Sequence, residues 1–255
     1  MSGGHAPGRP AKLAPGVMYM FSGRGGGVSA APYDTMNLGR SVGDDPAAVA
    51  ANRRLAAQAC GVAPERLNWM HQVHGTAVHY ASIGTPADNT VADGGEPPVA
   101  DAMYTDQAGP VLVVQVADCG PVLLADPRAR VVGAAHAGRE GMAAGVVTEL
   151  VTAMSAAGAD PAAMRAVIGP HICGGCYEVP AEMRARVAGK VPESACVTRA
   201  GSPGIDIRAG IEAQLARAGV RDVTHDRRCT AEAPELFSFR RDGRTGRLAG
   251  FVWLT

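Results

Sequence analysis

The segment that most constrains the fold is a short apolar run near the middle of the chain, residues 110–117. β-branched residues fill it almost continuously, and Gln115 is the one polar side chain that interrupts it. Such a composition is typical of a strand whose two faces are both buried. Two further strand-like segments follow at residues 121–125 and 131–135, separated by a short Asp-Pro turn. The sequence therefore predicts a buried sheet at the centre of the fold.

Other segments carry ordinary helix and strand signals. Asp45 and Pro46 are typical of a helix N-cap and first residue, and Gly61 is typical of the end of that helix. Apolar residues at four-residue spacing predict one helix with a wide apolar face over residues 142–154. Further helices are predicted at residues 180–188 and 205–218. Further strands are predicted at residues 17–21, 67–82, 166–169 and 248–254, the last paired with another C-terminal strand across a turn at residues 242–243.

The arrangement of these elements indicates one domain. The chain has 255 residues, 47% of them apolar, which suits a globular protein with a large core and excludes a disordered one. The Gly- and Pro-rich residues 83–99 are expected to form a surface loop. Strands cluster centrally and helices are interspersed irregularly, so we expect the α+β class rather than a βαβ repeat. We expect a flexible N-terminal tail over residues 1–15 and a single catalytic domain over residues 16–255.

Charge and hydropathy exclude several classes of partner. Lys and Arg together number 24, as do Asp and Glu, so zero net charge removes the electrostatic case for nucleic acid or an anionic membrane. Every apolar run is shorter than the ~18 residues that a membrane-spanning helix needs. The N-terminus lacks the apolar stretch of a secretory signal. We therefore expect a cytoplasmic protein whose six cysteines stay reduced. The sequence leaves the oligomeric state open, with a monomer as the expectation.

Three short segments place metal-binding or nucleophilic residue types beside glycine at the ends of predicted strands. They are residues 71–75, which hold two histidines, residues 117–121, which hold Cys119, and residues 135–138, which hold His136. Two histidines and a cysteine would make an open zinc site, with three protein ligands and a fourth position for water or substrate. The spacing is long-range and matches no local zinc motif.

Other interpretations of these residues stay open. Each histidine alone is more often a surface or satisfied core residue, and Cys119 alone is more often a small buried side chain. Cys119 could equally act as a nucleophile with His74 or His136 as its base. Cys173 and Cys176 form a lone C-x-x-C without a second pair to complete a zinc site, so we interpret both as loop cysteines.

A series of short motifs runs through the chain from residue 17 to residue 255. They include Gln-Val-His-Gly at 72–75, Ala-Asp-Cys at 117–119 and Ala-His-Ala-Gly at 135–138. The others are at residues 21–29, 33–39, 42–45, 168–170, 177–179, 228–230 and 237–242. In order and spacing they resemble a bacterial family first described as laccase-like polyphenol oxidoreductases. The same family has been assigned as zinc-dependent purine nucleoside phosphorylases with adenosine deaminase activity, and as peptidoglycan editing factors.

The resemblance implies a fold like that of the cytotoxic necrotizing factor catalytic domain, a mixed β-sandwich with flanking helices. It implies that His74, Cys119 and His136 bind zinc, with copper as an alternative metal, and that these residues are catalytic. It also implies phosphorolysis of adenosine, inosine and methylthioadenosine, with adenosine deamination as a side activity. The expected partners are therefore a purine nucleoside and phosphate.

Further roles follow from the matching motifs. Asp118 is expected to be catalytic, as a proton carrier or as the group that orients a histidine ligand. Arg24, Asn37 and Gln72 are expected to bind substrate, and Arg24 could hold phosphate.

The chain departs from the family pattern directly after His136. The family usually has His-Ala-Gly-Trp-Arg-Gly, whereas this chain has Arg139 and Glu140 in the Trp and Arg positions. A shift of one place at a helix start rotates a side chain by ~100°, so Arg139 need not replace the family's arginine. The alternatives to the nucleoside enzyme are a metal-free Cys–His hydrolase or amidase linked to peptidoglycan quality control, a copper-dependent polyphenol oxidase, and a non-catalytic role in cell-wall quality control.

Overall fold

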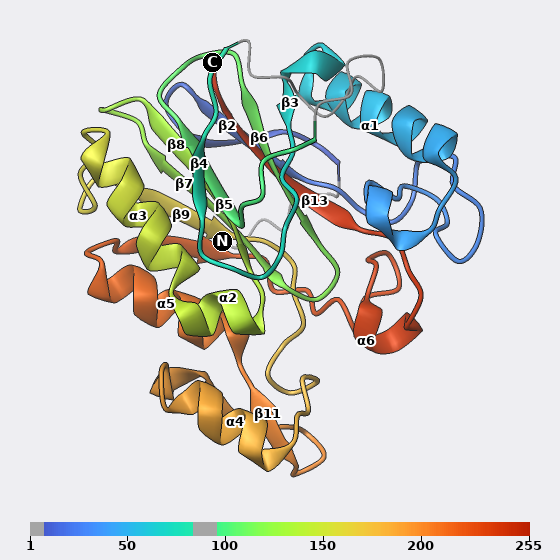
Figure 1. Cartoon of the computed structure of the whole chain (residues 1–255), viewed down its shortest axis with the longest axis vertical. Helices are drawn as coiled ribbons and strands as arrows, with labels where there is room; N and C mark the ends of the chain where they lie inside the picture. Colours follow the sequence, from blue (N-terminus) through green and yellow to red (C-terminus); the bar gives the residue numbers. More distant parts are fainter. Residues whose placement is uncertain (1–7, 84–95) are drawn as a thin grey trace.

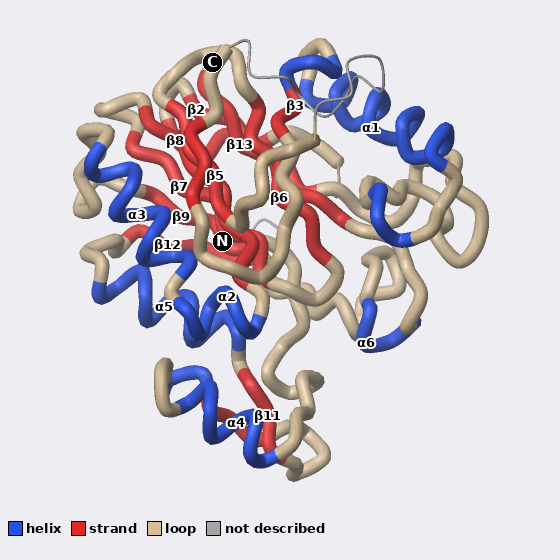
Figure 2. Tube along the Cα trace, viewed as in Figure 1, coloured by secondary structure: helices blue, strands red, loops and turns tan. Residues whose placement is uncertain are grey.

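Two mixed β-sheets packed face to face form the centre of the protein, and helices cover their outer faces (Figure 1). The computed structural model describes residues 8–83 and 96–255. Most of the predicted surface loop at 83–99 and the first part of the predicted tail therefore lie outside the described residues. The strands lie side by side in the middle with the helices around them (Figure 2). The predicted α+β class with a mixed β-sandwich core and flanking helices is confirmed.

The first sheet has five strands in the order β1-β2-β13-β6-β3. All neighbours are antiparallel except β3 and β6, which are parallel. Its strands are β1 (Ala11–Ala14), β2 (Val17–Phe21), β13 (Leu248–Leu254), β6 (Val111–Val116) and β3 (Leu67–Asn68).

The second sheet has six strands in the order β12-β9-β7-β8-β5-β4. The two outer pairs are parallel and the inner pairs are antiparallel. Its strands are β12 (Asp222–His225), β9 (Arg165–Ile168), β7 (Gly120–Asp126), β8 (Val131–Ala137), β5 (Ala102–Thr105) and β4 (Val78–Tyr80).

The central strand β6 is buried on both faces, as its composition predicts. Leu112 and Val114 pack between the sheets, whereas Val111 and Val113 belong to the core under the helix that covers the first sheet. Strand β7 alternates in the same way, with Leu123 between the sheets. Burial of each such side chain contributes about 1.5–3 kcal/mol, so the long apolar strands supply much of the stability.

Helices close the sandwich on both outer sides. Helix α1 (Pro46–Cys60) covers the first sheet, with Asp45 as its N-cap and Gly61 at its C-cap, as predicted. Helices α3 (Val146–Ala156) and α5 (Ile207–Arg217) pack on the second sheet. The remaining helices are α2 (Arg139–Ala144), α4 (Ala181–Ala188) and α6 (Phe239–Asp242), with single 3-10 turns at Arg40–Val42, Pro64–Arg66 and Pro192–Ser194.

The apolar segment predicted as one helix over residues 142–154 is two helices. Gly145 separates α2 from α3 because it adopts a left-handed φ of 97°, which ends the first helix and turns the chain into the second. Met142 and Met154 are still buried in one core, so the apolar spacing reports their common burial rather than one continuous helix.

Two further predictions are wrong. Residues 11–14 of the predicted N-terminal tail form strand β1, which pairs with β2 through Ala11 and Tyr19. The turn at Asp242 and Gly243 does not join two strands, because the residues before it form the short helix α6, capped by the Ser238 side chain. A separate hairpin, β10 (Ala195–Val197) with β11 (Pro203–Ile205), lies beside α4 and extends from the body of the molecule (Figure 1).

No helix within residues 8–83 and 96–255 combines the length and apolar character needed to span a bilayer.

Candidate metal centre

Three segments from the same end of the sandwich bring His74, Cys119 and His136 together. Strands β7 and β8 pair antiparallel, with Pro121 opposite His136, so Cys119 just before β7 lies beside the end of β8. The Sγ atom of Cys119 is 3.8 Å from Nε2 of His74, and the two imidazole centroids are 4.7 Å apart. One ligand atom from each of the three residues lies within 4.8 Å of the others. We call this group the His–Cys–His site.

The backbone at this site is held in an unusual conformation. His74 has φ 61° and Asp118, the neighbour of Cys119, has φ 89°, both in the left-handed region that non-glycine residues rarely adopt. Such conformations cost about 1–3 kcal/mol each and persist where the surrounding structure fixes them. Here both positions turn the chain so that side chains from two different loops face each other.

Asp101 holds the two histidine segments in place. Its carboxylate accepts hydrogen bonds from the backbone N–H groups of Val73, His74 and Gly75 at 3.1, 2.9 and 2.7 Å. Its Oδ1 also lies 2.8 Å from Nδ1 of His136, which places the imidazole proton on Nδ1 and leaves Nε2 as the ligand atom. Sequence reasoning missed Asp101, and the available signal was a lone carboxylate within an otherwise apolar segment, residues 99–103.

Neighbouring charges set the protonation states at the site. Burial alone would raise the pKa of Cys119, but the charge and hydrogen bonds of His136 and His74 lower that pKa from 9.0 to about 6. Burial would lower the pKa of His136, but the Cys119 thiolate and Asp101 raise it to about 9. Burial would raise the pKa of Asp101, but hydrogen bonds from His136 and Gly75 lower it overall. In the metal-free site Cys119 is therefore a thiolate at neutral pH, which is the form that ligates metals.

The space between these side chains depends on Gly138. A Cβ atom at this position would lie 2.7 Å from Cδ2 of His74 and 2.9 Å from Sγ of Cys119, which is too close for either contact. Glycine therefore leaves the imidazole and the sulfur free to approach a common centre. Two imidazoles and one thiolate are a donor set that suits zinc and copper, so the residues present fit a metal ion.

The His–Cys–His site forms one wall of a cavity of about 730 Å³. This volume lies in the range of small-molecule pockets. Tyr177 and Phe239 contribute aromatic surface to the cavity, and Gln72 and His71 also line it. Several cationic side chains complete its lining: Arg40, Arg53, Arg139, Arg240 and Arg247.

The predicted substrate-binding residues are placed differently from one another. Gln72 lines the cavity, but its amide exchanges two 2.8 Å hydrogen bonds with the backbone of Gln115. Asn37 is fully buried behind the cavity, where its amide bonds to Gly39 and to the backbone N–H of Arg247. It therefore acts by positioning the loops that carry Gly39 and Arg247.

The structure places Arg24 away from the cavity lining. Its guanidinium pairs with Asp34 at 3.0 Å and with Asp242 at 3.3 Å, and it lies over the Phe237 ring. The carboxylates of Asp34 and Asp242 neutralise the positive charge of Arg24 that would otherwise attract phosphate. The expected phosphate role is therefore not supported by the position of Arg24, and other arginines line the cavity instead.

Asp118 does not contact a histidine ligand. Its carboxylate accepts hydrogen bonds from Thr230 Oγ1 at 2.5 Å, Ser238 Oγ at 2.7 Å and the backbone N–H of Arg240 at 2.6 Å. Because three donors occupy the carboxylate, Asp118 organises the C-terminal loops around the cavity. The expected orienting role belongs to Asp101.

Sequence reasoning assigned none of the arginines that line the cavity, and two of them show how they are held. Arg139, at the start of α2, contacts the Tyr177 hydroxyl at 3.3 Å and pairs with Glu140 at 2.9 Å. Arg247 donates to the carbonyls of Thr245 and Gly246, and its burial lowers its pKa. Arg139 therefore faces the cavity despite the departure from the family pattern.

Known proteins resemble this chain in sequence and in fold. A protein of Streptomyces griseus named purine nucleoside phosphorylase is 52% identical over 246 residues, covering 96% of this chain and 98% of that protein. A purine nucleoside phosphorylase of Deinococcus radiodurans is 38% identical over 253 residues, covering 98% and 94%. The crystal structure of YlmD from Geobacillus stearothermophilus has a TM-score of 0.88 at 30% identity and covers 96% of this chain and 94% of its own.

The family model described as multi-copper polyphenol oxidoreductase laccase matches residues 18–255. This match includes every strand of the two sheets except β1, and every segment of the His–Cys–His site. Together with relatives that align over nearly the whole length, it confirms the resemblance found in the sequence motifs, and this chain belongs to the multi-copper polyphenol oxidoreductase laccase family.

Proposed function

We propose that this protein is a zinc-dependent purine nucleoside phosphorylase that acts on adenosine, inosine and methylthioadenosine, with adenosine deamination as a side activity. The observation that carries the proposal is one cavity that combines the His–Cys–His site with several arginines. The names of the relatives from Streptomyces griseus and Deinococcus radiodurans support the same activity.

The arginines that line the cavity are suited to bind phosphate. Arg139, from the start of α2, and Arg240, from α6, both line the cavity beside Tyr177, and the guanidinium of Arg240 lies 4.9 Å from the centre of that ring. A guanidinium binds phosphate through paired hydrogen bonds. Tyr177 and Phe239 line the cavity and offer aromatic surface against which a purine can pack.

The phosphorolysis step needs phosphate on one side of the ribose and the purine on the other. A phosphate oxygen forms the new bond to the anomeric carbon while the glycosidic bond breaks. The electron pair of the broken glycosidic bond leaves with the purine. The arginines hold the phosphate for this displacement and lower the entropic cost of bringing two substrates together. Asp101 keeps the proton on Nδ1 of His136, so Nε2 stays directed toward Cys119 and His74.

His74, Cys119 and His136 would hold the zinc ion. When bound there, zinc supplies Lewis-acid polarisation and acidifies water, the chemistry that deamination of adenosine requires. Phosphorolysis and deamination would then share one cavity and differ in whether phosphate or water reacts.

The test is product formation from adenosine and phosphate by the purified protein. We expect adenine and ribose 1-phosphate, with inosine as the deamination product. Alanine substitution of His74, Cys119 or His136 should each reduce turnover at least ~100-fold, because loss of a direct ligand costs more than loss of a group behind it. His79→Ala is the matched control, since His79 does not line the cavity. Turnover that survives all three ligand substitutions would overturn the proposal.

Copper oxidation of phenols is the second candidate. The observation in its favour is the donor set itself, since two histidines and one cysteine also form trigonal copper sites. The family description also refers to polyphenol oxidation. An intense thiolate-to-copper absorption band in the protein as purified, with phenol oxidation and without phosphorolysis, would favour this candidate over the first.

A further inference from the structure

A second group of sulfur and carboxylate ligands lies outside the cavity. Cys173, Cys176, Cys229 and Glu232 each offer one ligand atom, and these four atoms lie within 4.8 Å of one another. We call this group the cysteine cluster. None of its residues lines the cavity of the His–Cys–His site. Within the described residues, these are the two groups of this kind.

Two loops build the cysteine cluster, and the fold holds them in register. In the first, the backbone N–H of Cys176 donates to the carbonyl of Cys173 at 2.9 Å, which makes a tight turn. In the second, the N–H of Glu232 donates to the carbonyl of Cys229 at 3.1 Å. A parallel bridge between His171 and Cys229 joins the loops. The turns therefore place all four side chains on one side.

A backbone N–H of the first loop points at a sulfur of the second loop. The N–H of Cys173 lies 3.3 Å from Sγ of Cys229. This contact orients the sulfur of Cys229 toward the loop of Cys173, and metals bind such sulfurs as thiolates. The spacing Cys-x-x-Cys followed by a distant third cysteine is one way in which zinc-binding loops present their ligands.

A positive charge lies over the cysteine cluster. The guanidinium of Arg199, from the turn between β10 and β11, is 3.1 Å from Sγ of Cys176 and 3.8 Å from Sγ of Cys173. It also forms an ion pair with Glu232. The Arg199 side chain is 61% exposed, so it can move toward solvent without losing core packing. The sulfurs and the carboxylate thus already attract a cation.

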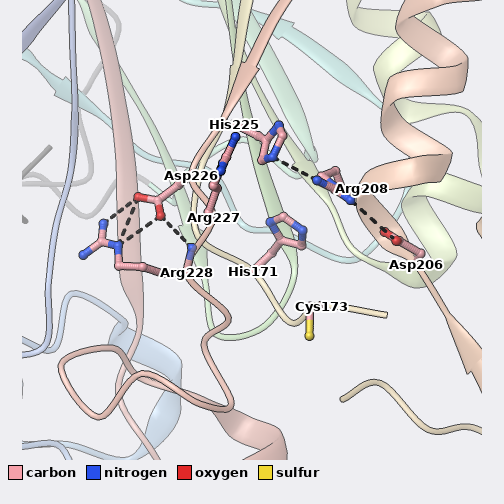
Figure 3. Close-up of a pocket in the computed structure, with 8 residues that line it drawn as sticks. All are labelled: His171, Cys173, Asp206, Arg208, His225, Asp226, Arg227 and Arg228. Atoms are coloured by element: carbon pink, nitrogen blue, oxygen red, sulfur yellow. Dashed lines mark hydrogen bonds and ion pairs between the residues drawn. The ribbon is translucent and has the colours of Figure 1, made fainter. Parts of the chain in front are cut away.

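Cys173 also borders a second, smaller cavity. That cavity, about 360 Å³, is lined by Cys173 together with His171, Arg208 and His225, among others. Figure 3 shows the Cys173 sulfur directed away from the His171 ring and from Arg208. The thiol therefore points away from these two basic groups, and its sulfur lies within 4.8 Å of the other ligand atoms of the cysteine cluster.

We propose that the cysteine cluster is a structural zinc site with Cys173, Cys176, Cys229 and Glu232 as its ligands. Tetrahedral ligands at the usual Zn–S distance of ~2.3 Å are ~3.8 Å apart. The four ligand atoms of the cluster lie within 4.8 Å of one another, so small side-chain movements would bring them to a common zinc ion. Four protein ligands leave no open position, which is the pattern of structural rather than catalytic zinc.

The site would connect two loops that both reach the catalytic cavity. The first loop leads from Cys176 directly into Tyr177, which lines the cavity. The second leads from Cys229 into Thr230, whose hydroxyl donates to Asp118 at 2.5 Å. Zinc at the cysteine cluster would therefore fix these loops relative to each other while taking no part in the reaction.

Metal content of the full-length protein tests the proposal. The protein purified from zinc-supplied cells without added chelator should hold about two zinc ions per chain, one for each site. Cys176→Ser should lose the zinc ion of the cysteine cluster and keep that of the His–Cys–His site. Cys119→Ser should lose the zinc ion of the His–Cys–His site and keep that of the cluster. Cys196→Ser is the matched control, because Cys196 lies 3.5 Å from the carbonyl of Gly174 but is not part of the cluster.

The outcomes separate this proposal from the proposed function. The cysteine cluster is supported if Cys119→Ser keeps a zinc ion that is lost when Cys176→Ser is added to it. This result would hold even if the nucleoside activity is absent. If Cys176→Ser holds as much zinc per chain as the wild-type protein, the proposal is overturned. A disulfide among Cys173, Cys176 and Cys229 in protein purified from zinc-supplied cells also overturns it.

X-ray absorption at the zinc edge covers the case in which Cys176→Ser does not fold. In the wild-type protein the two sites together should give an average of about two sulfur ligands per zinc, three in one site and one in the other. An average of about one sulfur ligand per zinc would leave the His–Cys–His site as the sole zinc site and overturn the proposal.

Discussion

Oδ1 of Asp101 lies 2.8 Å from Nδ1 of His136, and the same oxygen accepts the backbone N–H of His74 at 2.9 Å. One fully buried carboxylate thus fixes the ring of one histidine and the backbone of the other. Charge-assisted hydrogen bonds of this kind are roughly twice as strong as neutral ones. The geometry of the His–Cys–His site therefore depends on a residue that would not touch the metal itself.

Replacing Asp101 by asparagine tests this dependence. Asp101→Asn keeps the shape of the side chain but removes its charge, so it no longer fixes the proton on Nδ1 of His136. We expect zinc affinity to fall by ~10- to 100-fold, measured by competition with a chelator of known affinity. Asp106→Asn is the control, since Asp106 accepts a hydrogen bond from the exposed Tyr80 hydroxyl and does not line the cavity. Equal zinc affinity in both variants would contradict the role given to Asp101.

A methyl group at position 138 should disturb the same site by volume alone. In Gly138→Ala the added Cβ would meet His74 at 2.7 Å and Cys119 at 2.9 Å, so at least one of these ligands must move. We expect loss of bound zinc with the overall fold kept, measured by metal analysis and circular dichroism. Gly25→Ala is the control because a Cβ there meets nothing within 4 Å. Full zinc occupancy in Gly138→Ala would show that the ligands do not need this space.

The thiol of Cys119 should react with iodoacetamide at unusually low pH in metal-free protein. Because the thiolate is the reactive form, a pKa lowered to about 6 means that the alkylation rate rises through that pH and is near its plateau at neutral pH. In His136→Asn the stabilising charge is gone while burial remains, so the midpoint should move up toward or beyond the ordinary 9.0. The rates can be followed by mass spectrometry of the Cys119 peptide.

Two internal controls accompany this measurement. Burial raises the pKa of Cys60 to about 12, so Cys60 should remain unlabelled over the same pH range. Zinc loading should protect Cys119, because a coordinated sulfur is a poor nucleophile. A midpoint near 9 in the metal-free wild type would contradict the thiolate–imidazolium pair. Rapid labelling that zinc does not prevent, together with activity insensitive to chelators, would favour a metal-free cysteine hydrolase.

The parts of the fold that the sequence predicts are those governed by local pattern. The β-branched run of β6 predicts burial on both faces because side chains alternate along a strand, and Leu112 and Val113 do enter different cores. Asp45 and Gly61 predict the ends of α1 because capping involves only neighbouring residues. The division at Gly145 was missed because apolar spacing is the same for one helix and for two helices that share a core.

The parts of the site that the sequence does not predict depend on contacts between distant residues. Asp101 bonds to a loop 26 to 28 residues away, and no spacing rule connects them. Arg24 was expected at the cavity, but it pairs with Asp242, 218 residues further along the chain. Cys173 lacked a second pair in the sequence, whereas the fold brings Cys229 to it across 56 residues. Such pairs are specified by sheet topology, which local residue patterns do not encode.

The last prediction concerns Arg139, where this chain departs from its family pattern. Its guanidinium faces the cavity and contacts Tyr177, so under the proposed function it binds phosphate. Removing one charge-assisted hydrogen bond costs about 1.5–3 kcal/mol, so Arg139→Ala should raise KM for phosphate by ~10- to 100-fold. The KM for adenosine should change much less, because the lost group contacts the anion rather than the base.

Arg186→Ala is the matched control for this variant. Arg186 contacts the same carboxylate, Glu140, at 3.4 Å, but its side chain is 61% exposed and it does not line the cavity. Steady-state kinetics with phosphate varied at saturating adenosine, and then the reverse, separate the two KM values. If both variants leave KM for phosphate unchanged while the wild type is active, phosphate is bound by Arg240 or Arg247 instead, and the arginine directly after the His-Ala-Gly motif has only a structural role.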